Sequence, residues 1–499
     1  MTNRVNFASD FFSIGVRRFF GVLGSGDSLD ITLDFLDQGG VFSSTSSEFY
    51  APIISGSINK LSSNRFKALS LSIRGPGLSS SLPGLYFNFL EDNHSISLSE
   101  GLDAEKSSLN FHKPFNSGTA LQSCGFTLKD DQEEFELGTN LQKLTEESGT
   151  RMIHVESGSN RIYSYSRHID EMCSEKSQET IGLKRIILVI GKRGMENSFV
   201  RDLVSTDIPF FLTPAALPFA NLRAHNFLGV WTGNEQFKSL LQESGLLEEA
   251  IIFRIGVMKR ELLTLKTKIT HFDFDMTSDK DNDRISELVA NHTTYNFSNE
   301  IVKFQKNKNL IALSDNSWSV FSVVQTINEF ITEFHVCFDV GSFATIVENY
   351  ILPINTLRIH SSFVGKFMGS AVPISIGVSM AEPDVPVLCL LGEGSYASST
   401  SELVTIAQMQ LPICLILLSD GSMHSITGQA TSQRQHLGAL LPPNLTTIKR
   451  MRFPDIPSYV IKSRTELTNK LLEWNRKFPI LLILEFDPEK YAKNVSLLR

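Results

Sequence analysis

The chain has 499 residues, of which 41% are hydrophobic and 20% are charged, with a formal net charge of −8. This length predicts about three domains, and the apolar content is sufficient for several hydrophobic cores. The acidic balance and the lack of basic runs argue against nucleic-acid or membrane partners, and no apolar run is long enough to cross a bilayer. The cysteines are scattered without metal-ligand spacing and no secretory signal is recognisable, which predicts a cytoplasmic protein. The five cysteines are Cys124, Cys173, Cys337, Cys389 and Cys414.

Residues 1–180 are expected to form the first domain. An amphipathic helical pattern leads to the motif FGVLG at residues 20–24, and Glu48 follows in the segment SSTSSEFYAPIISG. A short apolar strand, ALSLSI at residues 68–73, then runs into the turn sequence GPG at residues 75–77. A single glutamate at a helix start is most often an exposed residue without a specific role. This is the alternative to a functional interpretation of Glu48.

Residues 181–315 are expected to form a second, shorter domain. It opens on KRIILVIGKRG, a buried strand that ends at Gly191, and further strand-like segments such as EEAIIFRIGVMKREL and KITHFDFDM follow. The segment has no clear glycine-rich phosphate loop, which favours a structural spacer.

Residues 316–499 are expected to form the third domain. The helical pattern SVFSVVQTINEFI is followed by the strand HVCFDVG. The run VPVLCLL at residues 385–391 is unbroken and apolar, as expected for a parallel strand covered on both faces, and it ends at the glycine-bracketed acid Glu393. Helical spacing extends over residues 398–410 until Pro412 stops it.

Two acidic turns of this third domain are expected to meet. The strand ICLILLS at residues 413–419 stops at Asp420, and PILLILEF supplies a late strand. A right-handed crossover places the carboxyl ends of neighbouring parallel strands side by side. Glu393 and Asp420 should therefore converge at one edge of the sheet, beside a helix N-terminus. That geometry suits a hard divalent cation together with a phosphate group.

Residues 392–420 resemble the cofactor signature of thiamine-diphosphate enzymes. That signature reads Gly-Asp-Gly, a fixed gap, and then Asn-Asn at the end of the next strand. Glu393 stands where the family has aspartate, and Ser419-Asp420 stands where the family has Asn-Asn. Met368 and the glycine after it are similar to the Met-Gly helix entry of the same family, at the usual distance before the acid.

The first and second domains carry the same resemblance. Residues 20–24 and Glu48 are similar to the opening motif and the glutamate of the pyrimidine-binding domain, and the middle segment resembles the central domain of the acetolactate synthase, pyruvate oxidase and pyruvate decarboxylase superfamily. The resemblance implies an α/β chain with three doubly wound parallel-sheet domains. These would be pyrimidine-binding (1–180), central (181–315) and diphosphate-binding (316–499). Some members bind FAD or a nucleotide in the central domain, and this point stays open here.

The resemblance also implies cofactors and site residues. Thiamine diphosphate and Mg²⁺ would be bound, with the Glu48 carboxylate against N1′ of the aminopyrimidine ring and Met368 as the apolar wedge that bends the cofactor. The implied cofactor-binding residues are Glu48, Met368, Gly392, Gly394, Ser395, Asp420, Met423 and His424. The implied metal ligands are Glu393, Asp420 and Ser422.

The segment after Asp420 bears on the reaction. Its sequence, GSMHSITGQ, is similar to the tail of phosphonopyruvate and sulfopyruvate decarboxylases. Among possible acid/base groups His424 is the best placed, and Asp27 resembles the aspartate of a Gly-Asp pair in pyruvate decarboxylases. His94 and His112 are weaker candidates, since eleven histidines make coincidence easy.

The implied function is that of a thiamine-diphosphate-dependent decarboxylase or carboligase, which acts on a 2-oxo acid through an enamine intermediate. The family also implies a homodimer or homotetramer with active sites between subunits, in which Glu48 of one chain faces Glu393 and Asp420 of its partner. The altered cation motif leaves a second class open, a non-catalytic binding or scaffold protein that keeps the fold. Retention of Glu48, Met368 and Ser395 argues against that class.

Overall fold

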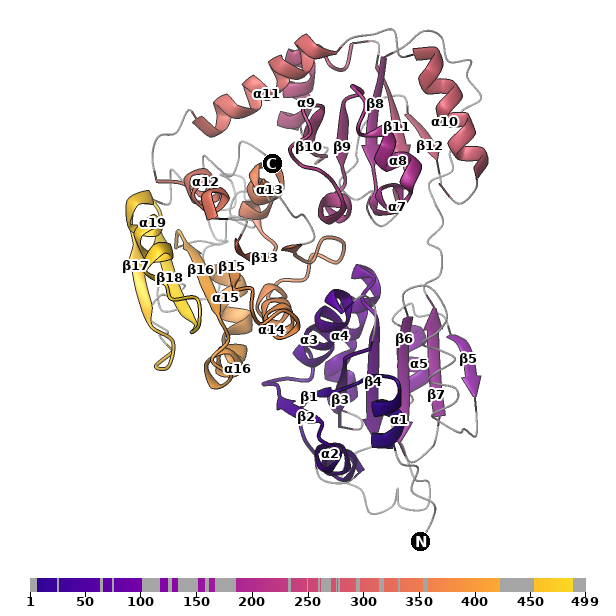
Figure 1. Ribbon diagram of the computed structural model, residues 1–499, viewed down its shortest axis with the longest axis vertical. Helices are drawn as coiled ribbons and strands as arrows, with labels where there is room; N and C mark the ends of the chain where they lie inside the picture. The colour runs from indigo at the N-terminus through magenta and orange to yellow at the C-terminus, as the bar shows by residue number, and fades with distance from the viewer. Residues whose placement is uncertain are drawn as a thin grey trace, which may run out of the picture.

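The computed structural model of the protein contains three α/β units, each built on its own sheet (Figure 1). This confirms the expected α/β class, while the boundaries at residues 180 and 315 stay predictions. The described residues are 7–24, 27–62, 66–73, 76–100, 117–123, 128–132, 151–157, 161–166, 185–231, 235–248, 250–258, 261, 271–274, 276, 279–292, 297–313, 318–330, 333–352, 358–421 and 453–487.

The first sheet is mixed, not entirely parallel. Its strand order is β2-β1-β3-β4-β6-β7-β5, and β7 pairs antiparallel with both β6 and β5. The remaining pairings are parallel. The expected parallel sheet is therefore wrong for β7 and β5, which extend it by antiparallel pairing that needs no crossover helix. The strands are β1 (Arg18–Gly21), β2 (Val41–Ser44), β3 (Ala68–Ser72), β4 (Ser95–Glu100), β5 (Leu128–Gln132), β6 (Arg151–Ser157) and β7 (Arg161–Ser166).

Helices cover both faces of this sheet. On one face Phe35 stacks on Phe19 of β1 with ring centroids 3.7 Å apart, inside a cluster that also buries Phe11. On the other face Ile54 packs with Phe20 of the same strand, because neighbouring strand residues point to opposite faces. The helices are α1 (Phe7–Ser13) and α2 (Asp27–Asp37) on the first face, and α3 (Tyr50–Leu61) and α4 (Pro76–Glu91) on the second; α5 (Ser117–Ser123) follows.

The middle sheet is parallel throughout its described strands, in the order β10-β9-β8-β11-β12. The carboxyl ends of β8 and β11 are in direct backbone contact. A Cβ atom at Gly191 would lie 2.2 Å from the carbonyl oxygen of Gly256, and Gly256 itself has a φ of +59°. Glycine is thus required at both positions for the two strand ends to approach. The strands are β8 (Arg185–Ile190), β9 (Phe210–Leu212), β10 (Phe227–Val230), β11 (Ala250–Ile255) and β12 (His271–Phe274).

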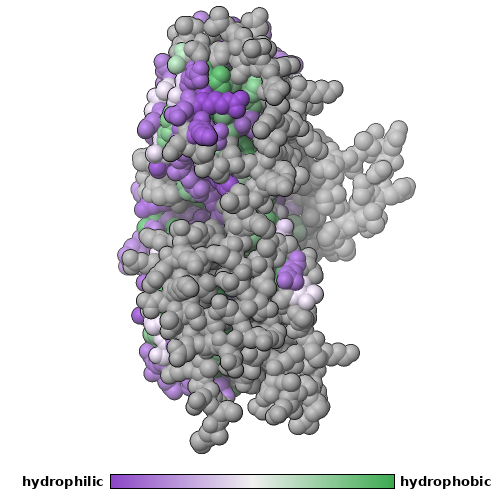
Figure 2. All heavy atoms as spheres, turned by 90° about the vertical axis from the view of Figure 1, so that its right-hand side faces the viewer, coloured by the Kyte–Doolittle hydropathy of each residue, from purple (hydrophilic) through white to green (hydrophobic). Residues whose placement is uncertain are grey.

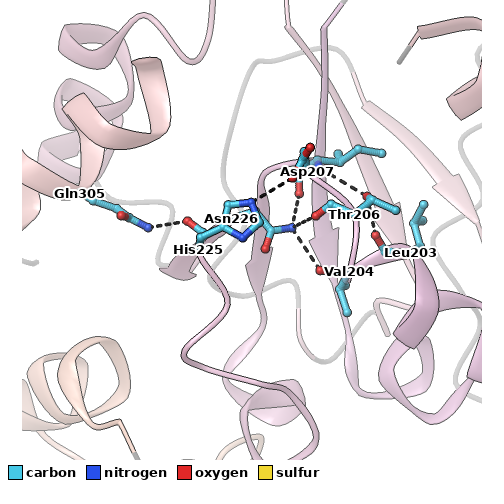
Figure 3. A network of polar contacts seen from close by, with 8 residues as sticks. Leu203, Val204, Thr206, Asp207, His225, Asn226 and Gln305 are labelled. Atoms are coloured by element: carbon cyan, nitrogen blue, oxygen red, sulfur yellow. Dashed lines mark hydrogen bonds and ion pairs between the residues drawn. The ribbon is translucent and has the colours of Figure 1, made fainter. Parts of the chain in front are cut away.

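Asn226 fixes the connection before β9 in this middle unit (Figure 3). Its buried side-chain amide donates to the carbonyl oxygens of Val204, Thr206 and Ile208 at 2.7–3.1 Å. Gln305 donates to the carbonyl of His225 at 2.8 Å, which ties the last helix of the unit to the turn just before β10. The helical segments are α7 (Lys192–Glu196), α8 (Ser198–Leu203), η2 (Pro214–Phe219), α9 (Glu235–Ser244), α10 (Asp279–His292) and α11 (Ser298–Leu313).

The third sheet is parallel in all its described pairings, in the order β14-β13-β15-β16-β18-β17. One face packs on α12, α13 and α19, and the other packs on α14 and α16. The strands are β13 (His335–Phe338), β14 (Ile359–His360), β15 (Val387–Gly392), β16 (Ile413–Ser419), β17 (Ser458–Ile461) and β18 (Ile480–Glu485). The helices are α12 (Val320–Phe330), α13 (Ser342–Tyr350), α14 (Ala371–Ala381), α15 (Glu393–Ser399), η6 (Thr400–Glu402), α16 (Leu403–Gln408) and α19 (Arg464–Glu473).

The first and third units pack together through α3 and α14, which lie side by side (Figure 1). Gly377 of α14 allows the close approach, since a Cβ atom there would lie 2.6 Å from the carbonyl oxygen of Ile54. A buried ion pair joins the first and middle units: Lys192 Nζ lies 2.6 Å from Asp92 Oδ2. The first unit therefore contacts both the third and the middle unit.

Among the coloured residues of Figure 2, a hydrophilic patch lies over the middle unit. There α10 exposes Lys280, Asp283, Arg284 and Glu287 and buries Ile285 on its inner side. Among the helices described, none combines the length and apolarity that a membrane crossing requires.

Candidate functional site

The carboxyl edge of the third sheet contains a topological switch point between β13 and β15. The chain leaves β13 toward β14 on one side and leaves β15 toward β16 on the other. In open α/β sheets, ligands bind in the crevice at such a point. Asp339 follows β13 and Glu393 follows β15, so two buried acids lie at the switch point.

Asp339 holds three segments of this edge together. Its Oδ1 accepts hydrogen bonds from Ser395 Oγ (2.7 Å), the Val340 amide (2.8 Å) and the Gly369 amide (3.1 Å). Its Oδ2 accepts from the Ala371 amide at 2.9 Å. Burial raises the pKa of the Asp339 carboxyl, while these hydrogen bonds act in the opposite direction. The carboxylate therefore fixes the start of α14 and the first turn of α15 relative to β13.

Glu393 and Asp420 lie at the ends of neighbouring parallel strands, as expected from the sequence. Gly392 of β15 pairs with Leu418 of β16, and Ser419 Oγ donates to Glu393 Oε1 at 2.6 Å. Both acids are buried, at 3% and 4% exposure. The single helix expected over residues 398–410 is wrong in its bounds. Helix α15 begins at Glu393 itself, and η6 and then α16 follow it.

Met368 lies in the loop before α14 and its side chain is 49% exposed, so it is not core filler. The first unit holds this loop in place. Glu91 Oε1 accepts from the amides of Val364 and Gly365, both at 2.9 Å, and from Ser362 Oγ at 3.2 Å. Gly369, next to Met368, has a φ of +84°, a conformation that glycine adopts at low cost.

Glu48 lies at the carboxyl edge of the first sheet, two residues before α3. Its side chain is half-buried, and a Cβ atom at Gly77 of α4 would lie 3.0 Å from its Oε1. The residues on either side of it contact the third unit. Ser46 bonds to Glu402, and Tyr50 Oη donates to the Ser398 carbonyl at 2.5 Å. The fold thus brings the Glu48 loop to the segment that follows Glu393 within one chain. The expected approach of Glu48 to the acids of a partner subunit stays a prediction.

The remaining predicted residues divide into four groups. Gly392 and Gly394 border Glu393, and Ser395 uses its hydroxyl on Asp339. His94 precedes β4, at the opposite sheet edge from Glu48, so the fold does not bring it to the site. Asp27 begins α2. His112, Ser422, Met423 and His424 fall outside the described residues, and with them the decarboxylase-like tail.

Asp339, Glu91 and Glu402 are site-organising acids that sequence reasoning missed. Asp339 had a usable signal, because it ends an apolar strand as Glu393 and Asp420 do. The other two act through contacts between residues more than 270 positions apart, which leave no local pattern.

Comparison with known proteins agrees with this geometry. Residues 339–472 match the family described as "Thiamine pyrophosphate enzyme, C-terminal TPP binding domain", a span that begins at Asp339 and contains Met368, Glu393 and Asp420. The chain is therefore similar to thiamine-diphosphate-dependent enzymes of the acetolactate synthase and pyruvate decarboxylase superfamily, as expected from the sequence.

Several acetolactate synthases are among the curated relatives. The chain is 24% identical to acetolactate synthase of Bacillus subtilis (strain 168) over 160 residues, which are 32% of this chain and 28% of the relative. It is 33% identical to the acetolactate synthase large subunit of Buchnera aphidicola subsp. Schlechtendalia chinensis over 129 residues, 24% of this chain and 21% of the relative. These alignments span between about a fifth and about a third of either chain.

Proposed function

We propose that the protein is a thiamine-diphosphate-dependent enzyme that acts on a 2-oxo acid, with carboligation favoured over simple decarboxylation. The observation that carries the proposal is the pair of buried acids Glu393 and Asp420 at adjoining strand ends, inside the segment that matches the cofactor-binding family. The acetolactate synthase relatives favour the carboligase, since that is the activity in their names.

The residues present fit a magnesium diphosphate. Glu393 and Asp420 offer hard carboxylate oxygens, and no group of three or more His, Cys, Asp or Glu ligands occurs in the described part of the chain. Mg²⁺ is usually held by one or two carboxylates, with water and phosphate oxygens completing the octahedron. The two carboxylates of Glu393 and Asp420 therefore match that arrangement.

In this proposal the organic part of the cofactor lies between Met368 and Glu48. When bound, thiamine diphosphate supplies a nucleophilic carbon for the keto group of the substrate. The exposed Met368 side chain, in a loop held by Asp339 and Glu91, would contact the cofactor. Glu48 would donate and recover a proton at the aminopyrimidine N1′. Asp27 and His424 remain candidates for proton transfer to the substrate.

The subunit arrangement and the compartment stay part of the proposal. We infer a cytoplasmic homodimer or homotetramer, from the family resemblance, without nucleic-acid or membrane partners. Ser422 as a third metal ligand and Met423 as a cofactor contact are carried forward on the same basis.

Cofactor binding tests the proposal against the scaffold alternative. Thermal unfolding is measured with thiamine diphosphate plus Mg²⁺, with the cofactor plus EDTA, and with thiamine plus Mg²⁺. A ligand that binds only the native state raises its apparent stability, so we expect an upward shift of the unfolding midpoint only in the first sample. No shift at saturating cofactor would favour the non-catalytic scaffold, and turnover of pyruvate would then be expected to be absent as well.

A further inference from the structure

The loop that carries Glu48 is tied to the third unit on both sides. Before Glu48, the Ser46 amide donates to Glu402 Oε1 at 2.7 Å and Ser46 Oγ donates to the same oxygen at 2.5 Å. After it, Tyr50 Oη donates to the Ser398 carbonyl at 2.5 Å. Residues 46 and 402 are 356 positions apart, so only the tertiary fold makes this contact.

Glu402 is the acidic member of this junction. It is fully buried at the end of η6, and its second oxygen accepts from Thr405 Oγ1 at 2.9 Å within the third unit. Burial raises the pKa of the Glu402 carboxyl, against the effect of the bonds from Ser46 and Thr405. Desolvation of a buried carboxylate is costly, so hydrogen-bond donors such as Ser46 and Thr405 are needed to stabilise it.

We propose that Glu402 is a positioning residue, which sets the place of Glu48 by holding the Ser46 amide and hydroxyl. This inference rests on the proposed function, because it assigns Glu48 its role in cofactor activation. Glu402 lies on the segment that begins at Glu393, so the cation site and the Glu48 loop are held by one continuous stretch of chain. A displacement of a reacting group by about 1 Å can cost roughly 10²-fold in rate.

Three variants separate positioning from charge. Glu402→Gln keeps an oxygen that can accept both Ser46 bonds and an amide that can face Thr405, so turnover should stay within about threefold of wild type. Glu402→Ala removes the acceptor, and turnover at saturating cofactor should fall by roughly 10²-fold while the cofactor Kd is unchanged. Ser46→Ala, at an exposed position, removes the hydroxyl contacts with Glu402 and Ser401 but keeps the amide bond to Glu402. It should reduce turnover less, with unchanged thermal stability. Thr405→Val is the matched control, since it removes a bond to the same carboxylate away from the Glu48 loop.

Amide hydrogen exchange gives a readout that does not depend on catalysis. In the protein without cofactor, exchange at residues 45–50 should rise in Glu402→Ala and stay at the wild-type level in Glu402→Gln and Thr405→Val. Unchanged exchange in Glu402→Ala would overturn the positioning role, and so would a Glu402→Gln variant as slow as Glu402→Ala. If the wild type binds no thiamine diphosphate, the proposed function fails, whereas the exchange result still decides whether Glu402 holds the loop.

Discussion

Ser419 Oγ donates to Glu393 Oε1 over 2.6 Å, across the ends of two neighbouring parallel strands. The resemblance to thiamine-diphosphate enzymes places aspartate and asparagine at these two positions. Here the acid is longer by one methylene and its neighbour is shorter, and the two side chains are hydrogen-bonded to each other. The charge of Asp420 is a further departure from the signature.

The coupling between Glu393 and Ser419 can be tested by changing the lengths of both side chains together. Glu393→Asp alone should weaken Mg²⁺-dependent binding of thiamine diphosphate, because the shorter acid cannot keep Ser419 and also reach the cation. Glu393→Asp with Ser419→Asn should recover most of the affinity, as measured by calorimetric titration. Ser419→Ala is the control for the hydroxyl. Additive losses in the double variant would show that the two positions are independent.

Glu48→Gln should retain thiamine diphosphate but lose nearly all turnover. The amide has the same shape as the carboxylic acid, yet it cannot exchange a proton with the aminopyrimidine, a loss in the range of roughly 10²–10⁴-fold for a general acid/base group. Turnover at saturating cofactor, with the Kd measured separately, checks this. Normal turnover would remove Glu48 from the mechanism.

Asp339→Asn should destabilise the protein. The carboxylate accepts from donors on both oxygens, and an asparagine amide would turn its own donor toward one of them, at a cost of about 1–3 kcal/mol for a buried unsatisfied pair. Urea unfolding monitors the free energy. Ser395→Ala, which removes one donor and keeps the carboxylate, should cost less. Wild-type stability in Asp339→Asn would mean that the hydrogen bonds to Asp339 contribute little to the free energy of unfolding.

The Lys192–Asp92 ion pair joins two units in a buried setting, with side-chain exposures of 11% and 4%. Lys192→Met should lower the free energy of unfolding by about 3 kcal/mol, because it leaves a buried carboxylate without its main counter-charge. The double variant Lys192→Met with Asp92→Asn should recover part of that loss, since no charge then remains to be desolvated. A double variant less stable than the single one would contradict this view.

His154 should make stability depend on pH. Burial lowers the pKa of this fully buried imidazole in β6 to about 4, whereas an unfolded histidine titrates near 6.5. The neutral form is therefore favoured in the native state, and its contribution, present above pH 6.5, is lost as pH falls toward 4. This amounts to about 2 kcal/mol between pH 7 and pH 5. His154→Gln should flatten that part of the curve measured by urea unfolding. An unchanged slope would assign the effect to His335 and His360, whose pKa values burial also lowers.

Much of the third unit follows from the sequence by itself. The apolar run at residues 413–419 is β16 to the residue, and the meeting of Glu393 with the end of β16 follows from two parallel strands joined by a right-handed crossover. Those features depend on short-range patterns, namely uninterrupted apolar runs and the residues that stop them.

Other features were decided by tertiary structure alone. The helix was expected to begin at residue 398, but it begins at Glu393. Gly394 and Ser395 carry no apolar periodicity that would have indicated this start. The bond from Ser395 to Asp339 fixes the first turn instead. The antiparallel β7 likewise depends on pairing, not on composition. Glu402 contacts Ser46 across a separation of 356 positions. Such buried polar contacts depend on the packing of the units. A desolvated carboxylate is stable only where packing brings its hydrogen-bond donors into place.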